Sequence, residues 1–305
     1  MGVRTNLGMT ALCAMVALGS TGCIKAMLIN GQLESTRKAS PAINTLGDFE
    51  VARGSAFASL GTLEGLHRLA PENADGLFLL TKAWTGASAG FIEDEWELAE
   101  DAEDDELADY HRTRARAAYT RAVHYGIELL EQTAEGFEQA RRNHDTMTAW
   151  LANFDEEDVP SLFWTGYAWI ARVNVSKDIP ALISDLFVGV AMIERVVELD
   201  ETYSHGLPHV VLGAYHARTP MAELDEAQKH FERALQINQG KLLMTKFQYA
   251  RTYYCWKNDQ ENYEKLMHEV IDGGDPLPEE RLTNTIAQRK AKRYLGEMRL
   301  ENCGF

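Results

Sequence analysis

Apolar residues recur along most of this chain at the three- and four-residue spacing of amphipathic helices. The pattern becomes continuous near residue 48 and extends into the C-terminal region. Helix-interrupting residues separate the periodic segments, at Pro71, residues 86–90, Pro160, Pro180, Pro208, Pro220, Gly240 and residues 273–278. These intervals predict a succession of antiparallel helix hairpins, and therefore an all-α fold.

A spacing of small and large residues recurs within the predicted hairpins. Gly213 and Ala227 are small enough to let two helices touch, Phe231 would fill the groove between them, and Ala234 would leave room for the next hairpin. Weaker copies occur at Ala115, Tyr119 and Ala122, at Gly189, Ile193 and Val196, at Ser59, Leu63 and Leu66, and at Asn262, Leu266 and Glu269. The repetition predicts an α-solenoid of degenerate tetratricopeptide-repeat (TPR)-like helix hairpins.

The N-terminus has the features of a lipoprotein signal peptide, predicted over residues 1–22. Arg4 precedes an apolar run over residues 7–18, which is too short for a membrane-spanning helix of about 20 residues. The small residues at positions 20–22 resemble a bacterial lipobox, so we expect Cys23 to carry a lipid, and Ile24 favours the outer membrane. Ordinary secretion is the alternative. Residues 23–46 are then expected to form a membrane tether with a first short helix, and residues 47–305 the TPR-like helical domain.

The charge distribution is strongly acidic. A formal net charge of −16 makes a nucleic-acid partner unfavourable, because a polyanion would be repelled. Residues 93–109 hold eleven acidic residues and no basic one. We expect this acidic insert to be a solvated loop between two helices of one repeat. The alternative is an acidic partner-docking surface, for which the candidate residues are Glu93, Glu95, Asp101 and Asp104.

Two cysteines follow the predicted lipid attachment site, Cys255 and Cys303. They could form a disulfide in an oxidising periplasm. Sequence spacing alone does not show that their Cα atoms approach closely enough, and two isolated buried thiols are the interpretation that we favour.

Signals of catalysis and metal binding are weak. Residues 86–90 match the Gly-x-Ser-x-Gly nucleophile elbow around Ser88, but that motif needs a strand-to-helix turn, and helix is predicted here. A serine hydrolase is therefore only a remote alternative, and a helix end or a close helix crossing is the preferred interpretation. His205 and His209 have the i, i+4 spacing of zinc ligands, but Gly206 and Pro208 lie between them, so at least His205 is expected outside the helix. We predict no enzymatic activity, no metal and no cofactor.

Aromatic residues near position 165 are the main candidates for ligand binding. Phe163 and Tyr167 share one helix face, whereas Trp164 and Trp169 lie off that face. We expect most of these rings in the core, with some lining an apolar cleft as the alternative. Arg116 could bind a carboxylate, or could pair with the acidic insert. The ligand-binding candidates are Trp164, Tyr167, Trp169, Arg116, Tyr119 and His209.

Four stretches, in order along the chain, resemble the T-component (TatT-like) lipoproteins associated with TRAP transporters. They are Ile24-Lys25 with Leu69-Ala70-Pro71-Glu72-Asn73; Phe91-Ile92-Glu93 with residues 114–122 (RARAAYTRA) and Tyr125-Gly126; residues 164–169 (WTGYAW) with Glu198-Leu199-Asp200-Glu201; and residues 206–213 (GLPHVVLG) with Pro220 and the helix of Ala227.

The resemblance implies a periplasmic, lipid-tethered α-helical protein that forms a homotrimer. It also implies a helical channel in each protomer for a small, partly apolar organic ligand. The implied partner is the periplasmic solute-binding protein of a TRAP-type uptake system. The alternative function is that of a generic TPR-like scaffold for envelope protein complexes, without a small ligand.

Overall fold

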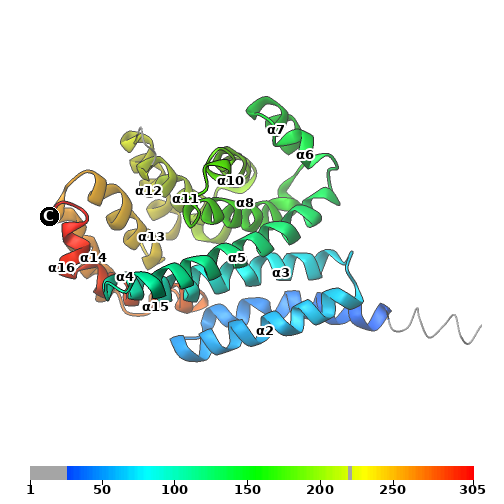
Figure 1. Ribbon diagram of the computed structural model, residues 1–305, viewed down its shortest axis with the longest axis horizontal. Coiled ribbons are helices and arrows are strands. Elements are labelled where there is room, and N and C mark those ends of the chain that lie inside the picture. Colours follow the sequence, from blue (N-terminus) through cyan, green and yellow to red (C-terminus); the bar gives the residue numbers. More distant parts are fainter. Residues whose placement is uncertain (1–25, 219–221) are drawn as a thin grey trace, which may run out of the picture.

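The computed structural model describes residues 26–218 and 222–305, and within these ranges every regular element is helical (Figure 1). The all-α prediction is confirmed. A helix over residues 26–39 leads into the first named elements. These are η1 (Ser40–Thr45), α2 (Phe49–Leu69), α3 (Ala74–Ala87), the π-helical turn η2 (Ser88–Ile92), α4 (Glu93–Asp101), α5 (Asp105–Glu131), α6 (Phe137–Ala140) and α7 (His144–Leu151).

The second half of the chain is built in the same way. Its elements are η3 (Glu156–Asp158), α8 (Val159–Asn174), α9 (Pro180–Ile183), α10 (Leu186–Asp200), α11 (Tyr203–Arg218), α12 (Leu224–Asn238), α13 (Leu243–Gln248), the π-helical turn η4 (Tyr249–Tyr254), α14 (Gln260–Ile271), η5 (Pro278–Glu280), α15 (Arg281–Tyr294) and α16 (Glu297–Glu301).

Several helix ends follow directly from local sequence chemistry. Asp48, Asn73 and Asp104 cap α2, α3 and α5 by accepting hydrogen bonds from backbone N–H groups of the first turn. Pro160 and Pro180 lie in the first turns of α8 and α9, where a proline costs no hydrogen bond. The interruptions predicted at these positions are therefore present.

Two of the predicted interruptions do not separate helices. Pro208 lies inside α11, just after a kink at residues 204–206. Residues 86–90 do not separate two helices, because the chain continues from α3 through the η2 turn into α4. A Cβ atom at Gly90 would lie 3.3 Å from the side chain of Ile286 on α15. Gly90 thus permits a close approach of α15. A close helix crossing was the second of the two interpretations given for these small residues.

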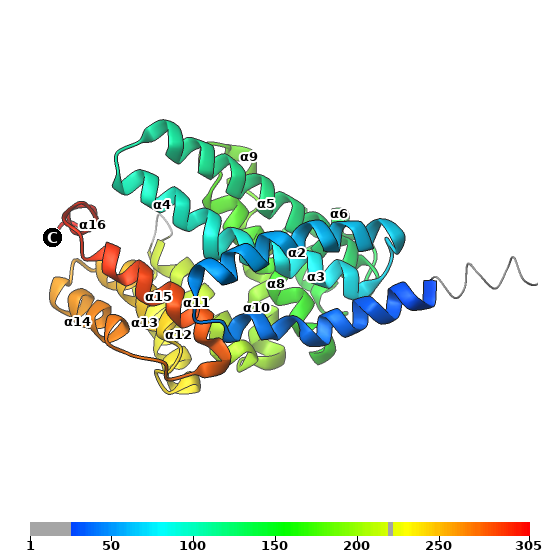
Figure 2. The ribbon, with the colours of Figure 1, turned by 90° about the horizontal axis from the view of Figure 1, so that it is seen from below.

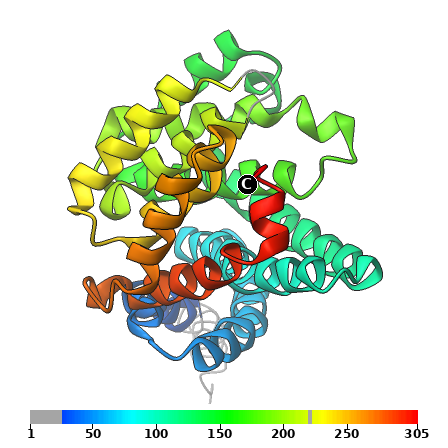
Figure 3. The ribbon, with the colours of Figure 1, turned by 90° about the vertical axis from the view of Figure 1, so that its left-hand side faces the viewer.

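Helices that follow one another in the chain pack side by side, from α2 through α3, α5 and α8 to α10 (Figure 1). Stacked hairpins would produce this order, but the α-solenoid arrangement itself stays a prediction. The C-terminal part departs from an open stack, because α15 returns to contact α2 and η1 (Figure 2). Ala52, Phe91, Leu282 and Ile286 form a buried cluster at this junction. In Figure 3 the orange and red C-terminal helices accordingly lie beside the blue N-terminal ones.

The close contact predicted for the α11–α12 hairpin is present. A Cβ atom at Gly213 would lie 2.9 Å from ring atoms of Phe231, and Phe231, Ala227 and Ala234 are completely buried. Any side chain at position 213 would therefore overlap the Phe231 ring, and only glycine avoids this overlap.

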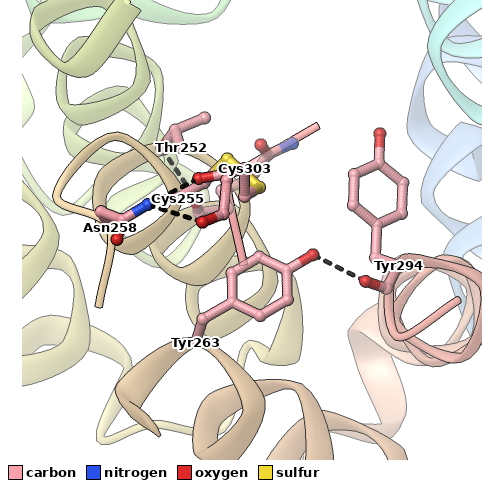
Figure 4. The surroundings of a disulfide bond; sticks show 8 residues. Thr252, Cys255, Asn258, Tyr263, Tyr294 and Cys303 are labelled. Atoms are coloured by element: carbon pink, nitrogen blue, oxygen red, sulfur yellow. Dashed lines mark hydrogen bonds between the residues drawn. A yellow bond between two sulfur atoms is a disulfide. The ribbon is translucent and has the colours of Figure 1, made fainter. Parts of the chain in front are cut away.

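Cys255 and Cys303 form a disulfide, so the interpretation as two isolated buried thiols is wrong (Figure 4). Their Cα atoms lie 4.9 Å apart and both residues are only partly buried. Asn258 donates hydrogen bonds to the carbonyl oxygens of Cys303 and Gly304, which fixes the C-terminus further. The sequence could not show this pairing because it depends on how α16 returns to η4.

The N-terminal predictions are only partly covered. The predicted signal peptide, Cys23 and the interruption at Pro220 lie outside the described residues. Of the expected tether, residues 26–39 form a helix whose Leu33 is completely buried. Among the described helices, none combines the length and the apolar character needed to cross a membrane.

Two glycine substitutions test the packing with opposite signs. We expect Gly213→Ala to destabilise the fold by about 1–3 kcal/mol, because the added methyl group overlaps the Phe231 ring. Gly61→Ala should instead stabilise it by about 0.5–1 kcal/mol, since Gly61 is an exposed position inside α2 with nothing near its Cβ site. Denaturant unfolding of both variants measures the two effects, and equal effects would contradict the packing argument.

Candidate functional site

A cavity of about 250 Å³ lies beside Trp164, where the N-terminal and C-terminal elements meet the middle of the chain. Its lining comes from η1, α3, α8, the start of α11, the segment before α13, η5 and α15. The lining residues are Pro41, Asn44, Lys82, Trp164, Tyr203, Ser204, Leu207, Leu242, Glu280 and Thr283. Trp164 is the one ligand-binding candidate from the sequence that lines this cavity.

The cavity contains a cation without a hydrogen-bond acceptor. Lys82 projects from α3, and no described residue accepts a hydrogen bond from its ammonium group or forms an ion pair with it; its Nζ lies 5.5 Å from the centre of the Trp164 ring. Burial lowers the pKa of Lys82, and the neighbouring Glu280 carboxylate opposes part of this shift. Lys82 is therefore a partly desolvated donor with capacity for a ligand acceptor.

The opposite charge in the cavity is held in place by its neighbours. Glu280 Oε1 accepts a hydrogen bond of 3.2 Å from Asn44 Nδ2, and its Oε2 accepts one of 2.9 Å from Thr283 Oγ1. These bonds join η1 to the η5–α15 junction and orient the carboxylate.

Trp164 and Tyr203 supply the aromatic wall. Burial raises the pKa of Tyr203 to about 12, so its hydroxyl stays neutral at physiological pH. The indole N–H of Trp164 is buried and meets no acceptor with good hydrogen-bond geometry among the described residues, although it is close enough to the Tyr203 hydroxyl to lower that pKa slightly. Flat aromatic walls with a few polar groups are typical of small-ligand sites.

The backbone is strained at the edge of the cavity. Ser204, His205 and Gly206 all have positive φ, at 47°, 60° and 79°. Residues other than glycine rarely adopt such angles. Asn238 supports this turn by donating a 3.2 Å hydrogen bond to the His205 carbonyl oxygen. These three residues form a non-helical kink within the bounds of α11, so the prediction that His205 is not in helical conformation is confirmed. Strain of this kind is frequent at ligand-binding sites.

The other aromatic candidates lie elsewhere. Tyr119 is completely buried and donates its hydroxyl to Glu93, and burial raises the pKa of both Tyr119 and Tyr167. Trp169 is buried, with its Nε1 donating a 2.8 Å hydrogen bond to the Asp185 carbonyl oxygen. A ligand role for these three residues stays a prediction, and the cavity beside Trp164 does not include them.

Arg116 and His209 also have partners within the protein. Arg116 pairs with Asp178, which lies outside residues 93–109, so the alternative of an ion pair with the acidic insert is wrong. His209 contacts His230 through Nδ1 at 2.8 Å and Glu201 through Nε2 at 3.1 Å. Burial lowers the pKa of His209. Across residues 26–218 and 222–305, no group of three or more His, Cys, Asp or Glu residues is placed to hold a metal ion.

Ser88 occupies the first position of the η2 turn, within a continuous helical path from α3 to α4. Its side chain is completely buried. The setting is a π-helical turn and not the strand-to-helix turn that a nucleophile elbow requires.

The acidic insert is not a solvated loop, which corrects the sequence-based expectation. It forms α4 and the start of α5, and Asp94 and Glu97 are buried against α15 and η4. Asp94 pairs with Arg289 and Arg293, and Glu97 pairs with Arg293 at 2.6 Å.

Lys290 and Arg251 complete the buried ionic cluster around Glu97, at 3.1 Å and 3.3 Å. Burial alone would raise the pKa of Glu97, but Lys290, Arg251 and Arg293 outweigh it and hold that pKa at about 2. The two carboxylates and Lys290 are buried, Arg251 and Arg293 are partly buried, and Arg289 is exposed. We refer to Asp94, Glu97, Arg251, Arg289, Lys290 and Arg293 together as the buried ionic cluster, after its two buried carboxylates.

The four docking candidates differ in accessibility. Glu95 pairs with Arg53 and Arg114, Asp101 pairs with Arg299, and Glu93 accepts the Tyr119 hydrogen bond. A docking partner that used Glu93, Glu95 or Asp101 would have to displace these partners within the protein. Asp104 is exposed at the turn between α4 and α5, where it caps α5. A docking role for all four stays a prediction.

Sequence reasoning missed Lys82, Tyr203 and Glu280. One signal was available, because Lys82 is the only charged residue in segment 77–87, which is apolar apart from Lys82, Thr81 and Thr85. Glu280 lacked such a signal, since it is one of many acidic residues and its place in the cavity depends on the return of α15 to η1.

Comparison with known proteins gives a family match that includes most of the residues lining the cavity. The chain matches the sequence model of a family described as TRAP transporter T-component over residues 46–299, which include every lining residue except Pro41 and Asn44. It is also similar to an uncharacterized protein of Treponema pallidum (strain Nichols), with 24% identity over 190 residues. The aligned part covers 59% of this chain and 58% of the length of that protein.

The buried ionic cluster predicts a large cost for removing one carboxylate. We expect Glu97→Gln to destabilise the fold by about 3–5 kcal/mol, because buried Lys290 and partly buried Arg251 and Arg293 lose a counter-charge. The exposed control Glu106→Gln should change stability by no more than about 0.5 kcal/mol. Urea unfolding at neutral pH measures both.

The same variant should change the acid sensitivity of the protein. Because the folded pKa of Glu97 is lowered from 4.5 to about 2, its contribution is complete above pH 4.5 and is lost as the pH falls towards 2. The stability difference between the unsubstituted protein and Glu97→Gln should therefore narrow over that interval. A stability difference that stays constant over this pH interval would contradict the lowered pKa of Glu97.

Proposed function

This chain belongs to the TRAP transporter T-component family, and on that basis we propose that it docks a periplasmic solute-binding protein and holds a small, partly apolar organic ligand. A T-component is an accessory part of a TRAP transporter and does not belong to a known enzyme family. The observation that carries the ligand part of the proposal is the cavity beside Trp164. It combines aromatic and aliphatic walls with a few oriented polar groups.

The docking part of the proposal rests on the turn between α4 and α5. Exposed acidic residues surround Asp104 there, and the apolar side chains of Leu107 and Tyr110 are 43% and 59% exposed. Apolar residues within a charged rim are typical of protein–protein interfaces. The solute-binding protein would present basic groups to this turn.

The cellular placement in the proposal comes from the sequence. We place the protein in the periplasm, attached by a lipid on Cys23 to the outer membrane. Its assembly as a homotrimer is proposed from the family resemblance alone. The helix over residues 26–39 would then separate the lipid from the α-helical domain.

A pull-down from cell envelopes tests the docking function. The bait is the soluble form without residues 1–23, and captured proteins are identified by mass spectrometry. We expect recovery of a periplasmic solute-binding protein, with less recovered at high salt because exposed charges are screened. Asp104→Lys combined with Tyr110→Ala should reduce recovery, whereas the control Glu226→Lys on the exposed face of α12 should not.

Recovery of other envelope proteins without a solute-binding protein would contradict the proposal. That result would favour a generic scaffold for envelope complexes.

A further inference from the structure

The cavity beside Trp164 presents one positive and one negative side chain to the same small space. Lys82 and Glu280 both line it, yet they do not form an ion pair with each other. Each therefore retains capacity to bind a group of the opposite charge. A ligand that carries only one charge would satisfy one of these side chains and face the other as a like charge.

Lys82 and Glu280 both have unused hydrogen-bonding positions for a ligand, and Lys82 has more of them. An ammonium group has three donors, and no described residue accepts from Lys82. A carboxylate has about four acceptor positions, and Glu280 uses two of them for Asn44 and Thr283. The cavity thus offers donors at one place and acceptors at another.

The size and walls of the cavity restrict the rest of the ligand. A dry cavity of about 150 Å³ can hold benzene, whereas drug-sized ligands occupy pockets of about 300–1,000 Å³. A volume of about 250 Å³ therefore suits a molecule with a short apolar side chain and one or two charged groups. Trp164, Leu207 and Leu242 provide the apolar surface.

We propose that the cavity recognises a small zwitterion with an apolar side chain, of the chemical class of an α-amino acid. Its carboxylate pairs with Lys82, its ammonium group pairs with Glu280, and its side chain packs against Trp164. This inference deepens the proposed function and rests on its ligand-binding part. Burial of Lys82 favours it, because a partly desolvated ammonium gains more from a carboxylate than an exposed one does.

Isothermal titration of the purified protein with three matched probes tests the proposal. Leucine carries both charges, 4-methylpentanoate lacks the ammonium group, and 3-methylbutylamine lacks the carboxylate. Leucine should bind about tenfold more tightly than either analogue, because only leucine satisfies both charged side chains. Equal binding of 4-methylpentanoate and leucine would overturn the proposal in favour of an anion site, and equal binding of 3-methylbutylamine would overturn it in favour of a cation site. No detectable binding of leucine, valine or phenylalanine at millimolar concentration would also overturn it.

Two variants assign the charges separately. Lys82→Met should abolish the preference for leucine over 3-methylbutylamine, and Glu280→Gln should abolish the preference for leucine over 4-methylpentanoate. The controls Lys265→Met and Glu279→Gln alter exposed residues outside the cavity and should leave both preferences unchanged. If Lys82→Met does not fold, Glu280→Gln and the probe series on the unsubstituted protein still decide the matter.

The two levels of the proposal fail separately. Capture of a solute-binding protein together with no selectivity for the zwitterion would overturn this inference and leave the docking function standing. Selectivity for leucine without capture of a solute-binding protein would overturn the docking function and leave this inference standing.

Discussion

The structure depends on burying two carboxylates of α4, those of Asp94 and Glu97, against the cations of α15 and η4. Moving such charges out of water costs several kcal/mol for each ion, and the cost is recovered only when well-placed partners surround them. Arg293 contacts both carboxylates, and Lys290 and Arg251 complete the surroundings of Glu97. Because α4 cannot keep these groups buried alone, α15 must return across the fold to its N-terminal half.

The candidate site follows from that return. When α15 contacts α2 and η1, it brings Glu280 and Thr283 to Asn44 and completes the wall opposite Lys82 and Trp164. The left-handed turn at Ser204 closes another edge, with Asn238 as its support. A cavity assembled from seven separate parts of the chain is therefore a property of the closed arrangement. The buried ionic cluster and the apolar cluster of Ala52, Phe91, Leu282 and Ile286 both join the two ends of the fold in that arrangement.

Local features of this protein were predictable from sequence, and features that depend on distant partners were not. The helices and their caps follow from neighbouring residues, as at Asp48 and Pro160. The contact between Gly213 and Phe231 was predictable because both residues belong to one hairpin. The conformation of the acidic insert was predicted incorrectly. Arg289 is 195 residues from Asp94 in the chain, and no local feature of the sequence indicates that the two residues pair. The disulfide and the partner of Arg116 were missed for the same reason. Trp164 was found through its aromatic surroundings, whereas Glu280 became recognisable only when the two ends of the fold met.

Hydrogen exchange measured by mass spectrometry on the variant Arg293→Met would test most directly whether the buried ionic cluster holds the fold closed. At a temperature where the variant remains folded, amides in residues 278–294 and in residues 40–45 should exchange faster together. Those in α7 and α10 should keep their protection, because these helices pack on each other and not on α4, η4 or α15, which carry the cluster. Faster exchange confined to the residues next to position 293, or spread evenly over the whole chain, would contradict the account.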